Sequence, residues 1–227
     1  MNLWQARQKS LEWLETELSE QKVLIEKGFA ILDVCIVLLN KQGKDSMHEL
    51  NGRFARVVNL TLAKARNLLF GSYSMLLDAI AQEAGALLRL IIEAYELLIY
   101  FRLEPSRVDE AIDGKLPNAG QIARKIEGEF KDLRNYLNNS ASHLSFNFNT
   151  ARHLIDYKTS EVKAIQTQSL EVFKINLATL NGFQIYIASE AIMCLHTIGY
   201  NTDSLVYEFE NWRQECIQAF PLPTTHP

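Results

Sequence analysis

The sequence predicts an all-α fold: a helical bundle with two long central helices and a loop-rich insertion. The prolines of the chain are Pro105, Pro117, Pro221, Pro223 and Pro227. Residues 1–104 and 118–220 therefore contain none, which favours long helices because proline breaks helix interiors. The alternation of apolar and polar residues that is typical of strands is hard to find in either stretch. We interpret residues 1–227 as one domain, with a loop-rich segment at about 105–160.

The N-terminal third predicts two helices. The first is expected from about Leu3 to Leu39, with a break near Gly28, and the polar segment 40–45 ends it. Ser46 and Glu49 have the spacing of a capping box, in which the two side chains satisfy free backbone donors, so the second helix should begin there. The apolar face of this second helix is Leu50, Phe54, Val57, Val58, Leu62, Ala65 and Leu69.

A central helix is expected over Leu68 to Leu103, with Gly71-Ser72 separating it from the helix before. Glu104-Pro105 ends it, because a residue before proline is displaced from the α region. This segment is apolar almost all the way round, apart from one polar row: Asp78, Gln82, Arg89, Glu93 and Glu96. At about 100° per residue, the row falls within an arc of roughly 80°. It is either the solvent-facing edge of a buried helix or a line of charges facing the inside of the bundle.

The second half of the chain begins with shorter elements. Helical pieces are expected at about 106–112, 118–127 and 129–138, followed by a loop-rich stretch from Asn138 to Thr159. The second central helix should run from about Gln168 to Ile198, with Gly199 as its C-terminal cap. Asp203 should cap a last amphipathic helix that ends at Phe220.

Composition excludes several classes of protein. The net charge of −4 gives no global attraction for nucleic acid or for an anionic membrane surface. The segment Leu68 to Leu103 carries six charged residues, too many for an ordinary membrane span. The chain has no GxGxxG, Walker or GxSxG motif, so those enzyme classes have no support.

The cysteines and histidines indicate a cytoplasmic protein without a metal or cofactor. The cysteines are Cys35, Cys194 and Cys216, an odd number without a CxxC pair. Cysteines of this kind, two of them inside apolar runs, are typical of buried residues in a reducing compartment. No histidine follows a glutamate at the Glu-x2-His spacing of helical di-iron proteins.

Two groups of polar residues are candidates for a site: the charged pair in the polar row, and the segment at the end of the last short helical piece. Arg89 and Glu93 are four residues apart and can pair on one helix face. Glu190 lies inside an apolar run and needs a partner, for which Arg89 is a candidate. The segment from Arg134 to His143 combines a cation, amides, hydroxyls and an imidazole, which together can hold a phosphate and move a proton near neutral pH. The same residue types also make an ordinary helix stop.

Residues 41–66 form a weaker candidate for nucleic-acid contact. The basic residues here are Lys41, Lys44, Arg53, Arg56, Lys64 and Arg66. Arg53, Arg56 and Lys64 could share a helical face and contact a phosphate backbone. The alternative is a solvated face, since no aromatic residue is interleaved there to stack on bases.

The run from Leu87 to Tyr95, with Arg89-x3-Glu93, and the downstream Tyr136-x3-Ser140-x2-His143 resemble a family of uncharacterised all-helical bacterial proteins. That family is loosely similar to the HEPN superfamily (higher eukaryotes and prokaryotes nucleotide-binding), which includes metal-independent ribonucleases and toxins of phage defence. The resemblance covers about residues 70–150. It implies that Arg134 positions a phosphate and that His143 acts as general acid or base.

The spacing departs from the HEPN pattern, in which fewer residues separate the arginine from the histidine. Eight residues lie between Arg134 and His143. On one continuous helix this spacing puts the two side chains on different faces, so the chain would have to turn near Asn138.

Two hypotheses follow. In the first, a HEPN-like bundle binds or cleaves RNA, or binds a nucleotide, without a metal and in a defence or stress role. Its catalytic residues would be Arg134 and His143, which could converge across a homodimer interface, and its binding residues would be Arg89, Glu93, Tyr136, Asn139 and Ser140. In the second, the chain is a non-catalytic interaction or small-ligand-binding module. The same residues would then be a helix cap and an internal ion-pair network.

Overall fold

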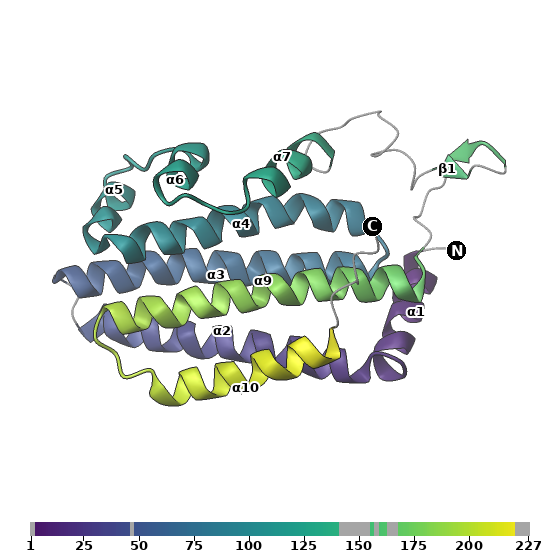
Figure 1. Cartoon of the computed structure of the whole chain (residues 1–227), viewed down its shortest axis with the longest axis horizontal. Helices are drawn as coiled ribbons and strands as arrows, with labels where there is room; N and C mark the ends of the chain where they lie inside the picture. Colours follow the sequence, from purple (N-terminus) through teal and green to yellow (C-terminus); the bar gives the residue numbers. More distant parts are fainter. Residues whose placement is uncertain (1–2, 46–47, 141–154, 157–158, 163–167, 221–227) are drawn as a thin grey trace.

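Four long helices form the body of the protein in a computed structural model of the chain (Figure 1). They are α2 (Ser19–Asp45), α3 (Leu50–Leu77), α4 (Ala81–Leu103) and α9 (Leu170–Thr197). The structure describes residues 3–45, 48–140, 155–156, 159–162 and 168–220. The predicted all-α helical bundle is confirmed for these residues, and α9 is the expected second central helix.

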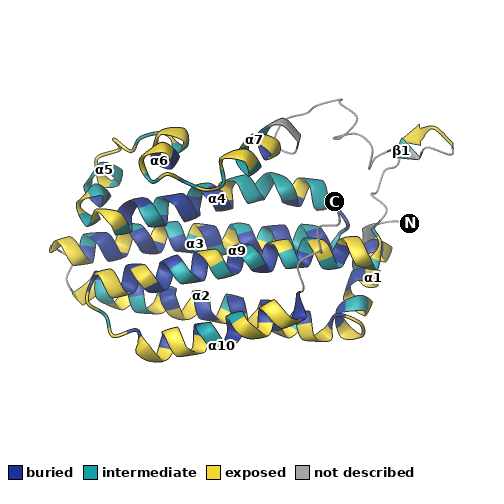
Figure 2. Ribbon diagram, viewed as in Figure 1, coloured by how far each residue is buried: buried dark blue, intermediate teal, exposed yellow. Residues whose placement is uncertain are grey.

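The long helices share one core. α9 packs against α2, α3 and α4, and α10 (Asp203–Ala219) lies along α2 and α9. Figure 2 shows buried residues on the facing sides of these helices. Large side chains such as Phe54, Phe101 and Phe173 are almost completely buried. All three cysteines are buried, as the sequence predicts. None of the described helices is both long and apolar enough to cross a membrane.

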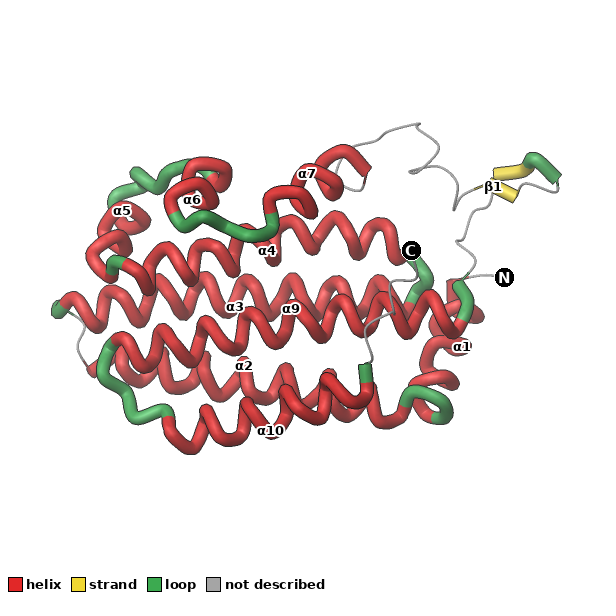
Figure 3. Tube along the Cα trace, in the orientation of Figure 1, coloured by secondary structure: helices red, strands yellow, loops and turns green. Residues whose placement is uncertain are grey.

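Short elements cover one side of α4. They are η1 (Pro105–Arg107), α5 (Val108–Ile112), α6 (Ala119–Lys125) and α7 (Lys131–Ser140), joined by the loops visible in Figure 3. The three helical pieces predicted between residues 106 and 138 are confirmed within a few residues. Ile155–Asp156 (β1), in the stretch predicted as loop, pairs antiparallel with Glu161–Val162 (β2), directly after that stretch.

The predicted break near Gly28 is wrong. The chain breaks instead between α1 (Leu3–Glu15) and α2, where the amide of Leu18 donates to the carbonyl of Trp13 at 2.8 Å. Gly28 lies inside α2, where its lack of a side chain makes room for Trp212 from α10. The helix also continues to Asp45, beyond the predicted end at Leu39.

The start of α3 and its course at Gly71-Ser72 also differ from the prediction. α3 begins at Leu50, and the N-cap residue Glu49 makes no side-chain capping bond, while Ser46 lies outside the described residues. The helix runs through Gly71-Ser72 without a break. A β-carbon on Gly71 would lie 3.2 Å from Cδ1 of Leu87, so this glycine permits close packing on α4.

The predicted continuous helix from Leu68 to Leu103 is broken at residues 78–80, between α3 and α4. Ala79 has a φ of 58° at this turn. The Nε atom of Arg7 lies 2.8 Å from Oδ1 of Asp78, and Nη2 of Arg7 donates to Ser74 at 2.9 Å. The break is therefore accompanied by an ion pair between Asp78 and α1, which is distant in the sequence. Asp78 belongs to this turn and is not on the polar face of α4.

The C-terminal helix ends follow the local signals closely. α4 ends at Leu103, directly before Glu104-Pro105. Gly199 follows α9 with a φ of 80°, and its amide donates to the carbonyl of His196 at 2.9 Å. α10 ends at Ala219, next to the predicted Phe220, but Asp203 is its first residue. Thr202 is the N-cap residue, without a side-chain capping bond, so the predicted cap at Asp203 is wrong.

Gly28→Ala should destabilise the protein. A β-carbon at Gly28 would lie 2.6 Å from Cζ2 of Trp212 and 3.0 Å from Gln184. Trp212 cannot retreat easily, since it is buried and donates to the carbonyl of Leu24 at 2.8 Å. We expect the free energy of unfolding, measured by urea denaturation, to fall by about 1 to 3 kcal/mol, although alanine is the better helix former.

Gly182→Ala is the matched control, since a β-carbon on Gly182 of α9 would have no neighbour within 4 Å. This variant should gain about 0.5 to 1 kcal/mol from helix propensity. An equal gain in both variants would show that the contact between Gly28 and Trp212 is not restrictive.

Candidate functional site

The polar row of α4 turns inward where α7 crosses it. Glu96 is 1% exposed, and Nη1 of Arg134, from α7, lies 2.8 Å from its Oε2 atom. One to two turns earlier, Nε of Arg89 lies 3.1 Å from Oε1 of Glu93, and both side chains are partly exposed. The row is therefore buried at Glu96 and open at Arg89. We call Arg89, Glu93, Glu96 and Arg134 the α4–α7 cluster.

Aromatic packing fixes the start of α7 over α4. Phe130, directly before α7, contacts the rings of Tyr95, Phe183 and Tyr186, with ring centroids 5.7, 5.6 and 5.2 Å away. Further along α7, Leu137 is buried. Arg134 lies between these two anchors, so its guanidinium group is held over α4 by the packing on either side.

The loop before α7 closes over the buried carboxylate. A β-carbon on Gly128 would lie 2.7 Å from Oε1 of Glu96, closer than side-chain carbons approach an oxygen. Glu127, next to it, has a φ of 53°. Among the residues that the structure describes, Oε1 of Glu96 has no hydrogen-bond partner, and the carboxylate is anchored there through Oε2.

Burial raises the pKa of Glu96 above its ordinary value of 4.5. The positive charge of Arg134 opposes this shift, and the negative charge of Glu93 adds to it. Burial is the largest of the three effects, so the cluster holds a carboxyl group that takes up a proton more readily than a free glutamate.

The guanidinium group of Arg134 keeps donors that these contacts do not use. Its Nη1 atom donates to Glu96 at 2.8 Å and approaches the carbonyl oxygen of Ala119 at 3.5 Å. Neither contact involves Nε or Nη2. The side chain of Arg89 is 36% exposed, so its pair with Glu93 is open to competition from a bound anion.

The predicted site residues on α7 and beyond are only partly brought together. Tyr136 is on α7 and 57% exposed. α7 extends through Asn139 to Ser140, so the turn expected near Asn138 is absent. The side chains of Asn139 and Ser140, and the whole of His143, lie outside the described residues. The convergence of Arg134 with His143 therefore stays a prediction.

The suggested pair of Arg89 with Glu190 is wrong. Glu190 of α9 pairs with Arg102, whose Nε and Nη2 atoms donate to its two carboxylate oxygens at 2.6 and 3.3 Å. Arg102 lies on the side of α4 that faces α9, whereas the row lies on the side of α7. Sequence spacing shows which residues share a helix face, but it does not show which neighbouring helix that face meets.

Part of the basic segment is used for internal ion pairs. Nε of Arg53 lies 2.9 Å from Asp109 of α5, and Nε of Arg66 lies 3.0 Å from Asp33 of α2. Each arginine also donates a second bond to the same carboxylate. These contacts favour a structural role for the two arginines over contact with a phosphate backbone.

Among the described residues, no group of three or more His, Cys, Asp or Glu side chains could hold a metal ion. Comparisons with protein-family models, curated protein sequences and solved structures find no match to this chain.

Arg134→Met should leave the Glu96 carboxylate buried without a cation. We expect a loss of about 3 to 5 kcal/mol in the free energy of unfolding, measured by urea denaturation. The double variant Arg134→Met/Glu96→Gln should recover part of this loss. Arg213→Met is the matched control, because Arg213 pairs with a half-exposed Glu210. If both arginine variants lose the same small amount, Glu96 does not depend on Arg134.

The free energy of unfolding should depend on pH through the protonation of Glu96. Because its pKa is raised in the folded state, the folded protein binds more protons than the unfolded chain just above pH 4.5. The free energy of unfolding contributed by this group is then complete at lower pH and decreases as pH rises through the folded pKa. Glu96→Gln should lack this decrease in denaturation curves recorded from about pH 4 to pH 8. Identical pH profiles of the two proteins would exclude Glu96 as the source.

Proposed function

We propose that the protein binds RNA, with the α4–α7 cluster holding a backbone phosphate. The observation that supports this proposal is the placement of Arg134. Its guanidinium group is fixed by buried Glu96, two helical turns along α4 from the more exposed Arg89, and its Nε and Nη2 atoms take no part in the contacts with Glu96 and Ala119. A preorganised guanidinium group suits a phosphate, because parallel N–H donors match its oxygens.

Two further features fit an RNA ligand. Tyr136 is exposed on α7, and an exposed aromatic ring can stack on an unpaired base. Because it lies two residues after Arg134, its ring is on a different face of the helix, so such a base would lie away from the phosphate held by the cluster. The net charge of −4 gives no general attraction for a polyanion, so binding must come from local contacts of this kind. Glu93 and Glu96 limit the positive charge of the cluster, and protonation of Glu96 would increase it.

The catalytic part of the proposal rests on His143. After RNA binds at the cluster, His143 would serve as general acid or base for metal-independent cleavage. This corresponds to the HEPN-like activity that the sequence resemblance implies, in a defence or stress role. The alternative is a non-catalytic interaction or ligand-binding module in which the cluster is an internal ion-pair network. A homodimer and a cytoplasmic location stay predictions.

RNA binding is tested with variants that keep the positive charge. Arg134→Lys can still neutralise Glu96 but loses the forked donor geometry, so affinity for single-stranded RNA should fall about tenfold. Arg89→Lys should weaken binding in the same direction. Arg213→Lys is the control, since Arg213 is 36% exposed like Arg89 but belongs to α10. Fluorescence anisotropy with labelled RNA measures all four proteins.

Cleavage is tested separately, by incubating wild type and His143→Ala with RNA in EDTA. Cleavage by wild type alone would support the catalytic role of His143. If RNA binds but is not cleaved, the protein is an RNA-binding module and the catalytic part is wrong. If the variants of Arg89 and Arg134 bind RNA as wild type does, the cluster is only an internal ion-pair network.

A further inference from the structure

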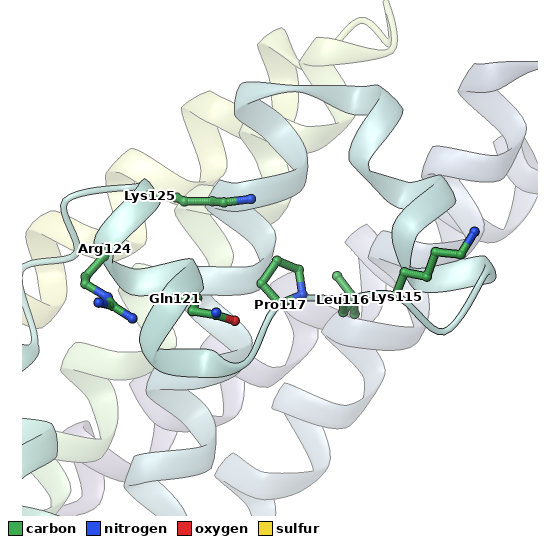
Figure 4. A pocket seen from close by; sticks show the side chains of 6 residues that line it. All are labelled: Lys115, Leu116, Pro117, Gln121, Arg124 and Lys125. Atoms are coloured by element: carbon green, nitrogen blue, oxygen red, sulfur yellow. The ribbon is translucent and has the colours of Figure 1, made fainter.

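A second polar site lies away from the α4–α7 cluster, in the cover formed by α5 and α6. A pocket of about 640 Å³ opens there, lined by Lys115, Leu116, Pro117, Gln121, Arg124 and Lys125. Figure 4 shows Leu116 and Pro117 between Lys115 on one side and the three residues of α6 on the other. This volume is within the range of about 300 to 1,000 Å³ that is usual for small-ligand sites.

The polar groups that line the pocket are hydrogen-bond donors. Lys115, Arg124 and Lys125 supply three cations, and no carboxylate is among the described residues that line the pocket. The side-chain oxygen of Gln121 already accepts from the amide of Asn118 at 3.0 Å, so only its NH₂ group is left for a ligand. A wall of cationic and amide donors suits a ligand group that only accepts hydrogen bonds, as phosphate does.

Two of the cations are oriented by the fold. Nζ of Lys125 donates to the hydroxyl oxygen of Tyr100 at 3.2 Å and lies 5.4 Å from the centre of its ring. The Tyr100 side chain is fully buried, and its hydroxyl donates to Glu110 at 2.8 Å, so Lys125 has a fixed anchor behind the pocket. Nε of Arg124 donates to the carbonyl of Gly120 at 3.2 Å, a contact that leaves its two terminal nitrogens for another acceptor.

The third cation is held only weakly. Nζ of Lys115 lies 2.9 Å from Oδ2 of Asp113, but the two side chains are 74% and 55% exposed. Exposed pairs of this kind contribute little to stability. A bound anion can therefore replace Asp113 at little cost, and Lys115 can turn toward the pocket.

We infer that this pocket binds a small phosphorylated molecule, with Arg124, Lys125 and Gln121 contacting the phosphate. Leu116 and Pro117 offer an apolar surface to the organic part of the ligand, and no aromatic ring lines the pocket for a series of stacked bases. A compact ligand such as a nucleoside phosphate or sugar phosphate fits this lining better than an extended polynucleotide.

Calorimetric titration tests the inference with ADP and pyrophosphate as probes. Wild type should bind both, and Arg124→Gln/Lys125→Gln should lose at least about tenfold in affinity. Both side chains are exposed, so the double variant should fold normally, which circular dichroism verifies. Lys27→Gln is the control, because Lys27 pairs with Glu215 at a distant surface. If wild type binds neither probe, or if the double variant binds as tightly as wild type, the inference is wrong.

A short single-stranded RNA separates this site from the proposed RNA site. The double variant should bind RNA as wild type does, and Arg134→Lys should bind ADP as wild type does. If the double variant loses affinity for RNA but not for ADP, the pocket belongs to an RNA-binding surface and the assignment to a small ligand is overturned. Loss of RNA binding in Arg134→Lys alone concerns only the α4–α7 cluster.

Discussion

Burial of α9 is the interaction on which the other long helices depend. α9 packs against α2, α3 and α4, and Gln184 at its centre is completely buried, with its amide donating to the carbonyl of Ile25 at 3.1 Å. A buried amide without such a partner would cost about 1 to 3 kcal/mol. The contact between α2 and α9 is therefore determined by this hydrogen bond as well as by the burial of apolar surface. Gly28, next to this bond, lets Trp212 pack at the same level and joins α10 to the core.

This arrangement leaves one side of α4 for polar chemistry. α3 and α9 cover the apolar sides of α4, and the chain between residues 105 and 140 returns over the third. On that third side, Glu96 meets a thin cover of short helices instead of bulk solvent, whereas Arg89 stays partly exposed. Glu96 is buried as a result, and its pairing with Arg134 joins the cover to the bundle. The pocket lies in this cover, and the α4–α7 cluster lies between the cover and α4, which is a rigid base for both.

The sequence predicts features that local chemistry decides. Proline at 105 ends α4, and glycine at 199 ends α9, because each imposes its backbone preference wherever it occurs. The break between α3 and α4 was not predictable in this way, since it coincides with an ion pair from Arg7, over 70 residues away in the sequence. The partner of Glu96 was missed for the same reason. The sequence places Glu96 in the polar row of an apolar helix and Arg134 in a polar segment at a helix end, but only the path of the chain over α4 pairs them.

The three buried cysteines give the bundle a set of internal chemical reporters. Cys35, Cys194 and Cys216 lie on α2, α9 and α10, one on each. Burial raises the pKa of Cys35 to about 12 and that of Cys216 to about 11, and it raises the pKa of Cys194 further. Since the thiolate is the reactive form, each sulfur is protected while its helix stays packed. The rate at which a thiol reagent modifies each cysteine thus reports how often its own helix opens. The rates at Cys216 and Cys194 therefore distinguish opening of α10, at the edge of the bundle, from opening of the central α9.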